Sequence, residues 1–79
     1  MIISAQIRAA RTALGWTTSQ LADYAGVATR TVLRLETSRG IPNANANTLH
    51  KIQAALEAAG IEFIGSPDDA PGIRIHAPK

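Results

Sequence analysis

The sequence predicts a mainly α-helical fold, with four helices followed by a short C-terminal β-hairpin. Three observations support this prediction. Apolar residues recur every three or four positions through most of residues 1–60, which is the spacing of one face of a helix. Gly15, Gly26 and Gly60 follow these stretches, where a glycine commonly ends a helix. Beyond residue 60, two runs rich in β-branched residues flank a segment of glycine, proline and aspartate, as in a hairpin.

The length and composition are typical of one small intracellular domain. A chain of 79 residues is close to the size at which a single core is only marginally sufficient, so help from a partner subunit would be natural. The absence of cysteine excludes a disulfide framework and a thiolate zinc site. No apolar run approaches the roughly 20 residues of a membrane helix, so we expect a soluble, cytoplasmic protein with no membrane partner.

The first predicted helix begins at Ser4 and runs to Leu14. A serine oxygen at the N-cap can accept a hydrogen bond from a free N–H group of the first turn. Ile3, Ile7 and Ala10 recur with Leu14 at helical spacing, and these residues form the expected buried stripe.

The second predicted helix has the clearest start in the chain. Thr17 and Gln20 stand three residues apart, the spacing at which each side chain can hydrogen-bond the backbone N–H of the other. Gly26 can adopt the left-handed conformation that ends a helix and allows a sharp turn. The helix is therefore expected over Thr18–Ala25.

The third predicted helix follows this turn directly and divides into two faces. Ala28 stands at its expected cap position but has no oxygen for the free N–H groups. Either Thr29 takes over as the cap, or the first turn is loose until a ligand orders it. The inward face is expected to contain Val27, Ala28, Val32 and Leu35, and the outward face Thr29, Arg30, Leu33, Arg34 and Thr37.

The remaining chain is predicted to form a loop, a fourth helix and the hairpin. Residues 37–46 contain glycine, proline, asparagine and serine and read as a loop that Ile41 anchors to the core. Asn47 or Thr48 is the expected cap of the fourth helix, which should run to Ala59. Its expected buried stripe is Leu49, Ile52, Leu56 and Ala59.

The predicted hairpin pairs residues 61–64 with residues 73–76 through a turn over 65–72. An isolated two-stranded ribbon is marginal in water, so its apolar residues must pack on the helices or on a second subunit. The alanines of the fourth helix offer a smooth surface to such a subunit, although alanine is also simply a good helix former. The candidates for a dimer surface are Ala54, Ala58, Phe63, Ile73 and Ile75.

Positive charge is concentrated in the first half of the chain. Residues 1–40 contain five arginines against Asp23 and Glu36, whereas residues 41–79 contain more acidic than basic residues. This asymmetry favours steering toward a phosphate backbone, the alternative being a chance scatter of surface charge. On the outward face of the third helix, Arg30 and Arg34 can reach guanine edges or phosphates, and Leu33 can touch a thymine methyl group.

The segment from Ile7 to about Leu56 resembles the helix-turn-helix of the lambda-repressor-like family, also called the xenobiotic response element family. The resemblance rests on three pieces taken together: Gln20-Leu21-Ala22, Ala25-Gly26-Val27, and Thr31-Val32 followed by Arg34-Leu35-Glu36. It implies a domain over residues 1–60 that binds double-stranded DNA, with residues 61–79 as a tail that can mediate dimerisation.

The resemblance also implies roles for individual residues. Helix 29–36 of each subunit of a homodimer is expected to enter the major groove, and we expect a transcriptional repressor. An ion pair between Arg11 and Glu36 would fix the first helix against the third, the alternative being a solvated Arg11. The expected base contacts are Thr29, Arg30, Leu33 and Arg34, and the expected phosphate contacts are Thr17, Thr18, Thr31 and Arg39.

Other functions find less support in the sequence. His50 and His76 are solitary and lack neighbouring carboxylates, so we expect no metal site, and no glycine-rich phosphate loop is present. Asp68 and Asp69 are expected in a solvated turn. An enzyme and a cofactor are therefore not expected. The remaining alternative is an antitoxin or another protein-interaction module that binds a toxin or other partner through the tail.

Overall fold

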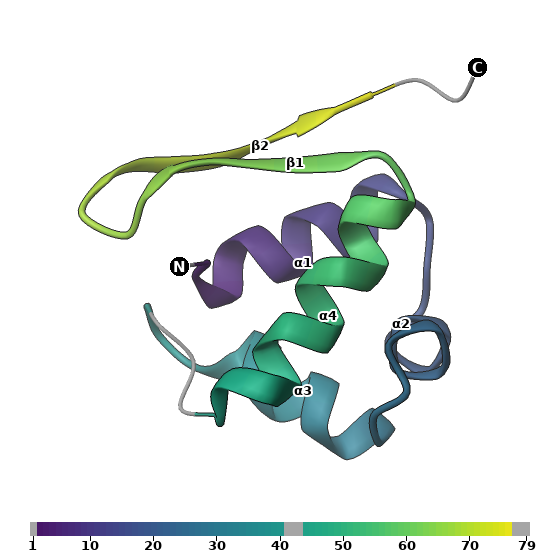
Figure 1. Cartoon of the computed structure of the whole chain (residues 1–79). Helices are drawn as coiled ribbons and strands as arrows, with labels where there is room; N and C mark the ends of the chain where they lie inside the picture. The colour runs from purple at the N-terminus through teal and green to yellow at the C-terminus, as the bar shows by residue number, and fades with distance from the viewer. Residues whose placement is uncertain (1, 41–43, 77–79) are drawn as a thin grey trace.

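The computed structural model describes residues 2–40 and 44–76. Four helices and an antiparallel two-stranded sheet confirm the predicted fold class. In Figure 1, α1 lies between the hairpin and α3, while α4 runs from the level of α3 toward the hairpin. The elements are α1 (Ser4–Ala13), α2 (Thr18–Ala25), α3 (Thr29–Thr37), α4 (Ala46–Ala58), β1 (Ile61–Ser66) and β2 (Asp69–Ile75).

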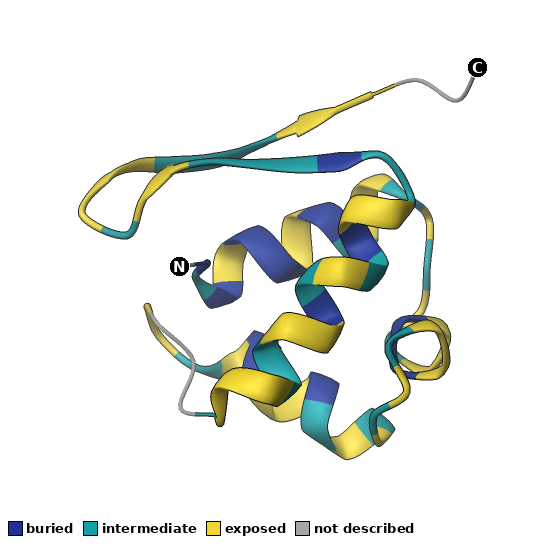
Figure 2. Ribbon diagram, in the orientation of Figure 1, coloured by how far each residue is buried: buried dark blue, intermediate teal, exposed yellow. Residues whose placement is uncertain are grey.

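One apolar core joins all four helices to the first strand. Figure 2 shows its buried residues on the facing sides of the helices and at the start of β1. Burying a valine, leucine or isoleucine side chain contributes about 1.5–3 kcal/mol, so the core is the main source of stability in so short a chain. The buried apolar residues are Ile2, Ile7, Ala10, Leu21, Ala22, Val32, Leu35, Ile52, Leu56 and Ile61.

The start of α1 differs from the prediction by one residue. Ile3 occupies the N-cap position, and its N–H donates to Oε1 of Gln6 over 2.8 Å. Ser4 is the first helical residue and is buried, and its N–H donates to the carbonyl oxygen of Gly40 over 2.9 Å. The predicted serine cap is wrong because the helix begins one residue earlier, which places Ile3 at the N-cap and Ser4 inside the first turn. The helix ends at Ala13, one residue before the predicted end.

The predicted capping box of α2 is confirmed. The Thr17 hydroxyl accepts from the Gln20 N–H over 3.1 Å, and the Thr17 N–H donates to Oε1 of Gln20 over 2.9 Å. Gly26 ends the helix with a φ of 72°, a left-handed conformation that glycine adopts without strain. This local sequence signal therefore places both ends of α2.

At α3, the prediction that Ala28 is buried and that Thr29 can act as the cap is wrong. Ala28 occupies the N-cap position and is exposed, and Thr29 is already helical. At the other end, α3 continues to Thr37, one residue beyond the predicted helix 29–36. The Thr37 hydroxyl donates to the carbonyl oxygens of Leu33 and Arg34 at 3.0 and 3.1 Å, and thereby satisfies groups that the helix end leaves free.

The fourth helix begins earlier than predicted. Its N-cap is Asn45, whose side chain accepts from the Thr48 N–H over 2.8 Å, so Asn47 and Thr48 lie inside the helix rather than at its cap. The helix ends at Ala58 instead of Ala59. The predicted anchoring role of Ile41 lies outside the described residues.

The hairpin is longer than predicted and its turn is shorter. Strand pairing continues to Ser66 opposite Asp69, instead of stopping at the ends of a turn over 65–72. An irregularity between Ile64 and Ser66 absorbs the extra residue of β2, and Gly65 has a φ of 76° there. A Cβ at Gly65 would lie 2.4 Å from the carbonyl oxygen of Ala70, so only glycine fits.

The apolar face of the hairpin packs on the helices, and one polar side chain of α1 binds the hairpin backbone. Ile61 is buried, and Phe63 and Ile73 are half-buried against the core. Nε2 of Gln6 donates to the carbonyl oxygens of Ile64 and Gly72 at 3.2 and 2.8 Å. The amide of one α1 residue therefore binds both strands.

Candidate nucleic-acid interface

Helix α3 presents opposite faces to the core and to solvent. Val32 and Leu35 are fully buried, and they fix the helix to the rest of the molecule. On the other side, Arg30 and Arg34 are exposed, and Leu33 is 49% exposed. Three of the four predicted base-contact residues, Arg30, Leu33 and Arg34, are therefore accessible to a partner on a helix that the core supports.

The first turn of α3 is open to an external hydrogen-bond acceptor. The backbone of Ala28 has the extended conformation of an N-cap, with a φ of −73° and a ψ of 145°. Among the described residues, no side chain caps this end of the helix. Thr29 and Thr31 are half-buried beside it. Free N–H groups at a helix start attract anions, so this turn suits a phosphate.

Arg11 and Glu36 join α1 to α3 by a bidentate ion pair. Nε of Arg11 lies 2.7 Å from Oε2 of Glu36, and Nη2 lies 3.0 Å from Oε1. The Arg11 side chain is 19% exposed and that of Glu36 is 6% exposed. Donation of hydrogen bonds to the Glu36 carboxylate raises the pKa of Arg11, although burial acts in the opposite direction. Arg11 therefore keeps its positive charge throughout the ordinary pH range, and its two bonds to Glu36 hold the orientation of α3.

A second arginine supports the same helix end, and the sequence reading missed it. Nη1 of Arg8 donates to the main-chain carbonyl of Glu36 over 3.1 Å, while Nη1 of Arg11 donates to the carbonyl of Trp16 over 2.8 Å. Residues three apart lie on the same side of a helix, so the spacing of Arg8 and Arg11 was a usable signal. Together these bonds connect α1, the segment before α2 and the end of α3.

The remaining predicted phosphate contacts lie at the start of α2 and after α3. Thr17 is exposed and Thr18 is half-buried, and the hydroxyl of Thr17 already accepts the capping bond from Gln20. Arg39 is exposed two residues beyond the end of α3. The neighbouring Gly40 accepts a hydrogen bond from the first residue of α1, which ties this segment to the body of the domain.

A comparison with protein families agrees with this architecture. A family model described as helix-turn-helix matches residues 7–61, which covers most of α1 and all of α2, α3 and α4. The chain belongs to the lambda-repressor-like helix-turn-helix family. No curated protein matches the chain.

Membership of this helix-turn-helix family indicates what the chain binds. The family binds DNA and is typically non-enzymatic, so the chain is a DNA-binding helix-turn-helix regulator. Helices α2 and α3 pack against each other across the turn at Gly26, as the motif requires. The hairpin lies almost entirely outside the matched residues, so the family match assigns no role to it.

The candidate dimer residues of this helix-turn-helix protein lie on α4 and on the hairpin. Ala54 and Ala58 are exposed on α4, and Ile75 is 57% exposed on β2. Phe63 and Ile73, by contrast, are half-buried against the protomer's own core. Of the five, Ala54, Ala58 and Ile75 are therefore the residues exposed to a partner.

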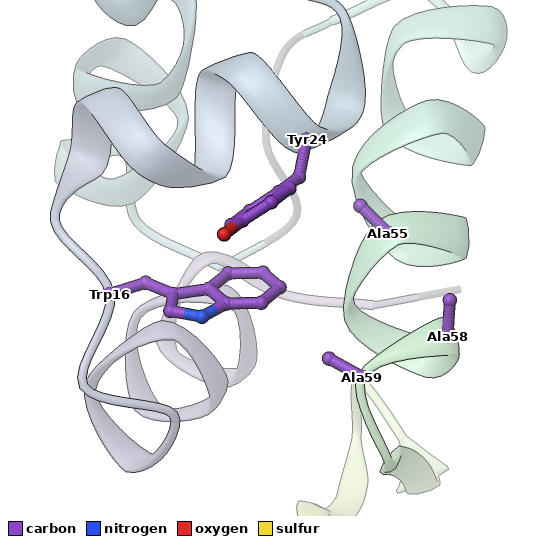
Figure 3. A pocket seen from close by; sticks show the side chains of 5 residues that line it. All are labelled: Trp16, Tyr24, Ala55, Ala58 and Ala59. Atoms are coloured by element: carbon purple, nitrogen blue, oxygen red, sulfur yellow. The ribbon is translucent and has the colours of Figure 1, made fainter.

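A shallow groove lies beside the α4 candidates (Figure 3). It measures about 270 Å³ and is open to solvent between the end of α2 and α4. The rings of Trp16 and Tyr24 form one wall, with centroids 4.4 Å apart and planes inclined at 38°. Ala55 and Ala58 of α4, with Ala59 directly after the helix, lie across from them.

The prediction that His76 lacks a neighbouring carboxylate is wrong. Its Nε2 lies 2.8 Å from Oε1 of Glu62, because the two residues are close across the hairpin despite their separation in sequence. Within residues 2–40 and 44–76, no three metal-binding side chains come together. In the same part of the chain, no helix has the length and apolar character needed to cross a membrane.

Proposed function

We propose that the chain is a cytoplasmic, sequence-specific transcriptional repressor that binds double-stranded DNA as a homodimer. The observation that carries this proposal is the exposed row of Arg30, Leu33 and Arg34 on a helix whose opposite face is fully buried. A base-reading side chain must be accessible, and its helix must hold one orientation. The Arg11–Glu36 pair supports that orientation from behind.

In the proposed complex, α3 of each subunit enters a major groove. Arg30 and Arg34 supply most of the base discrimination, because a guanidinium can donate two hydrogen bonds to guanine. Leu33 contacts a thymine methyl group, and Thr29 contributes a hydroxyl at the start of the helix. The two helices read half-sites whose centres lie roughly 34 Å apart.

Contacts to the DNA backbone set the position of this helix. The uncapped start of α3, together with Thr31, faces one phosphate, while Thr17 and Thr18 at the start of α2 bind another. Arg39 adds a charge contact beside the recognition helix. A dimer held in this way over a promoter represses by excluding RNA polymerase.

The proposal is tested by selecting bound duplexes from a random-sequence pool with the purified protein, at low and at physiological salt. We expect an inverted repeat that remains enriched at the higher salt. Binding that enriches no sequence and disappears with salt reflects phosphate attraction alone and contradicts the proposal.

A protein that shows no specific DNA binding would favour the antitoxin or protein-interaction alternative. In that case the exposed Ile75 and the alanines of α4 are the surfaces on which to look for a toxin or other partner. Co-purification with the product of a neighbouring small gene would then be the next measurement.

A further inference from the structure

The outer edge of β2 is free to pair with another strand. Within the described ranges 2–40 and 44–76, the sheet contains only β1 and β2, so each strand has an unpaired side. The N–H of His76 donates to the carbonyl of Gly60 over 2.8 Å, which makes this a hydrogen-bonded pair. Hydrogen-bonded and non-hydrogen-bonded pairs alternate along an antiparallel ladder. The main-chain groups of Ile73 and Ile75 therefore point away from β1.

A hollow of about 210 Å³ lies beside this edge, and β2 lines it whereas β1 does not. Ala5 and Ala9 of α1 form its floor, and both are exposed. Pro71 and Ile73 of β2 form its wall. The side chains of alternate residues lie on the same face of a strand, so the exposed Ile75 projects on the same side as these two residues.

We infer that two copies of this chain join by antiparallel pairing of their β2 strands about a two-fold axis at Ile73, forming a continuous four-stranded sheet. This inference names the surface of the dimer in the proposed function and rests on that part of it. Ile75, the most exposed residue on the inner face of β2, thereby gains a partner.

The register follows from the side chains of β2. With Ile73 on the axis, Ile73 exchanges both main-chain hydrogen bonds with its counterpart, and the N–H of Ile75 donates to the carbonyl of Pro71 in the other copy. Proline can occupy position 71 because this bond needs only its carbonyl oxygen and not the N–H group that proline lacks. Ile75 of one copy then lies opposite Pro71 of the other, over the hollow floored by Ala5 and Ala9.

The charges exclude the next register. With Arg74 on the axis, two arginines would lie directly opposite each other, which destabilises a strand pair. With Ile73 on the axis, each Arg74 lies opposite Gly72 and keeps its own contact with Glu62, at 3.3 Å. With Ile73 on the axis, the β2 strand of a second copy of this chain therefore fits the edge without opposing like charges.

The same axis gives an arrangement suited to DNA. A two-fold axis perpendicular to the sheet leaves the helices of both copies on one side, and α3 lies on the far side of α1 from the hairpin (Figure 1). Both α3 helices then face away from the sheet in the same direction.

Sedimentation equilibrium without DNA tests the surface. We expect Ile75→Glu and Ala9→Glu to raise the dimer dissociation constant about tenfold or more, because a carboxylate would enter the apolar contact. Ala58→Glu is the matched control, since it places the same charge on an exposed helical alanine of α4. Dissociation by Ala58→Glu and not by the other two variants would overturn the inference, as would a wild-type monomer at all concentrations.

Single cysteines test the register, because the natural chain has none. Residues 72 and 74 of opposite copies form a non-hydrogen-bonded pair with Cα atoms about 4.5 Å apart, within disulfide range. A mixture of Gly72→Cys and Arg74→Cys proteins should therefore cross-link on oxidation, while neither protein alone should do so. Cross-linking of Arg74→Cys alone would place Arg74 on the axis and refute this register.

These measurements separate the interface from the DNA-binding function. A dimer with the predicted cross-link that selects no DNA sequence supports the interface and refutes the proposed function. A monomer that selects a single half-site refutes the interface and leaves sequence-specific DNA binding in place.

Discussion

Replacing Glu36 with alanine tests the pair that orients the recognition helix. Breaking a buried ion pair from one side typically costs 3–5 kcal/mol, because a charge is left without its partner. The Arg11 side chain is 19% exposed to water and keeps its bond to the carbonyl of Trp16. Both features reduce the cost of leaving its charge without Glu36. We therefore expect a loss of about 3 kcal/mol, which in a domain of this size lowers Tm by roughly 12–24 °C.

The assay is thermal and urea unfolding followed by circular dichroism and by the fluorescence of Trp16, the single tryptophan, at one fixed protomer concentration. Glu57→Ala is the control, because this exposed glutamate of α4 should change stability by no more than about 0.5 kcal/mol. A double-mutant cycle with Arg11→Ala isolates the coupling between the two side chains. A Glu36→Ala protein that melts like the wild type, or a cycle without coupling, refutes the reasoning.

Three further predictions concern the DNA contacts, the hairpin and the helix cap. Arg34→Ala should lose about 1–3 kcal/mol at one base position, whereas Arg39→Ala should weaken all sequences alike and lower the salt slope by about 1; identical profiles in titrations against single-base variants of the selected site would contradict this. The pKa of Glu62 lies below its ordinary value of 4.5, mainly because of its hydrogen bond with His76. Its contribution to stability is thus present above the unfolded pKa and lost as pH falls through the folded value, and an NMR midpoint at or above 4.5 would contradict this. Ala28→Ser should stabilise the domain by about 1 kcal/mol in urea unfolding by supplying the missing cap, and an unchanged midpoint would argue against it.

The features that the sequence predicts best are those whose partners lie within a few residues. The limits of α2 follow from Thr17, Gln20 and Gly26, and all their interactions are local. The start of α4 was harder to predict because asparagines alternate with alanines there, so that several residues can act as a cap. Asn45 is the one that binds the N–H of Thr48.

Features that depend on distant partners escaped prediction. Gln6 and Arg8 read as ordinary polar residues of a helix, yet one binds the hairpin and the other the end of α3. The hairpin turn was overestimated because a glycine and proline-rich segment suggests a loop, whereas the irregularity opposite Gly65 lets pairing continue past it. For the DNA interface, the pattern of α3 indicated the exposed face, while Arg11 and Glu36 were identified through the family resemblance.

The bonds from Gln6 to the hairpin have a consequence for how the chain folds. Gln6 and Gly72 are 66 residues apart, whereas the packing of α2 on α3 joins consecutive helices. Contacts that close long loops form later than local ones, because the entropy of closure is lost before the contact compensates for it. During synthesis, the helices can therefore assemble first, and the Gln6 side chain remains without its strand partners until the ribosome has released residue 72. If β2 forms the dimer as inferred, subunits meet only after this late step, which keeps incomplete chains from pairing.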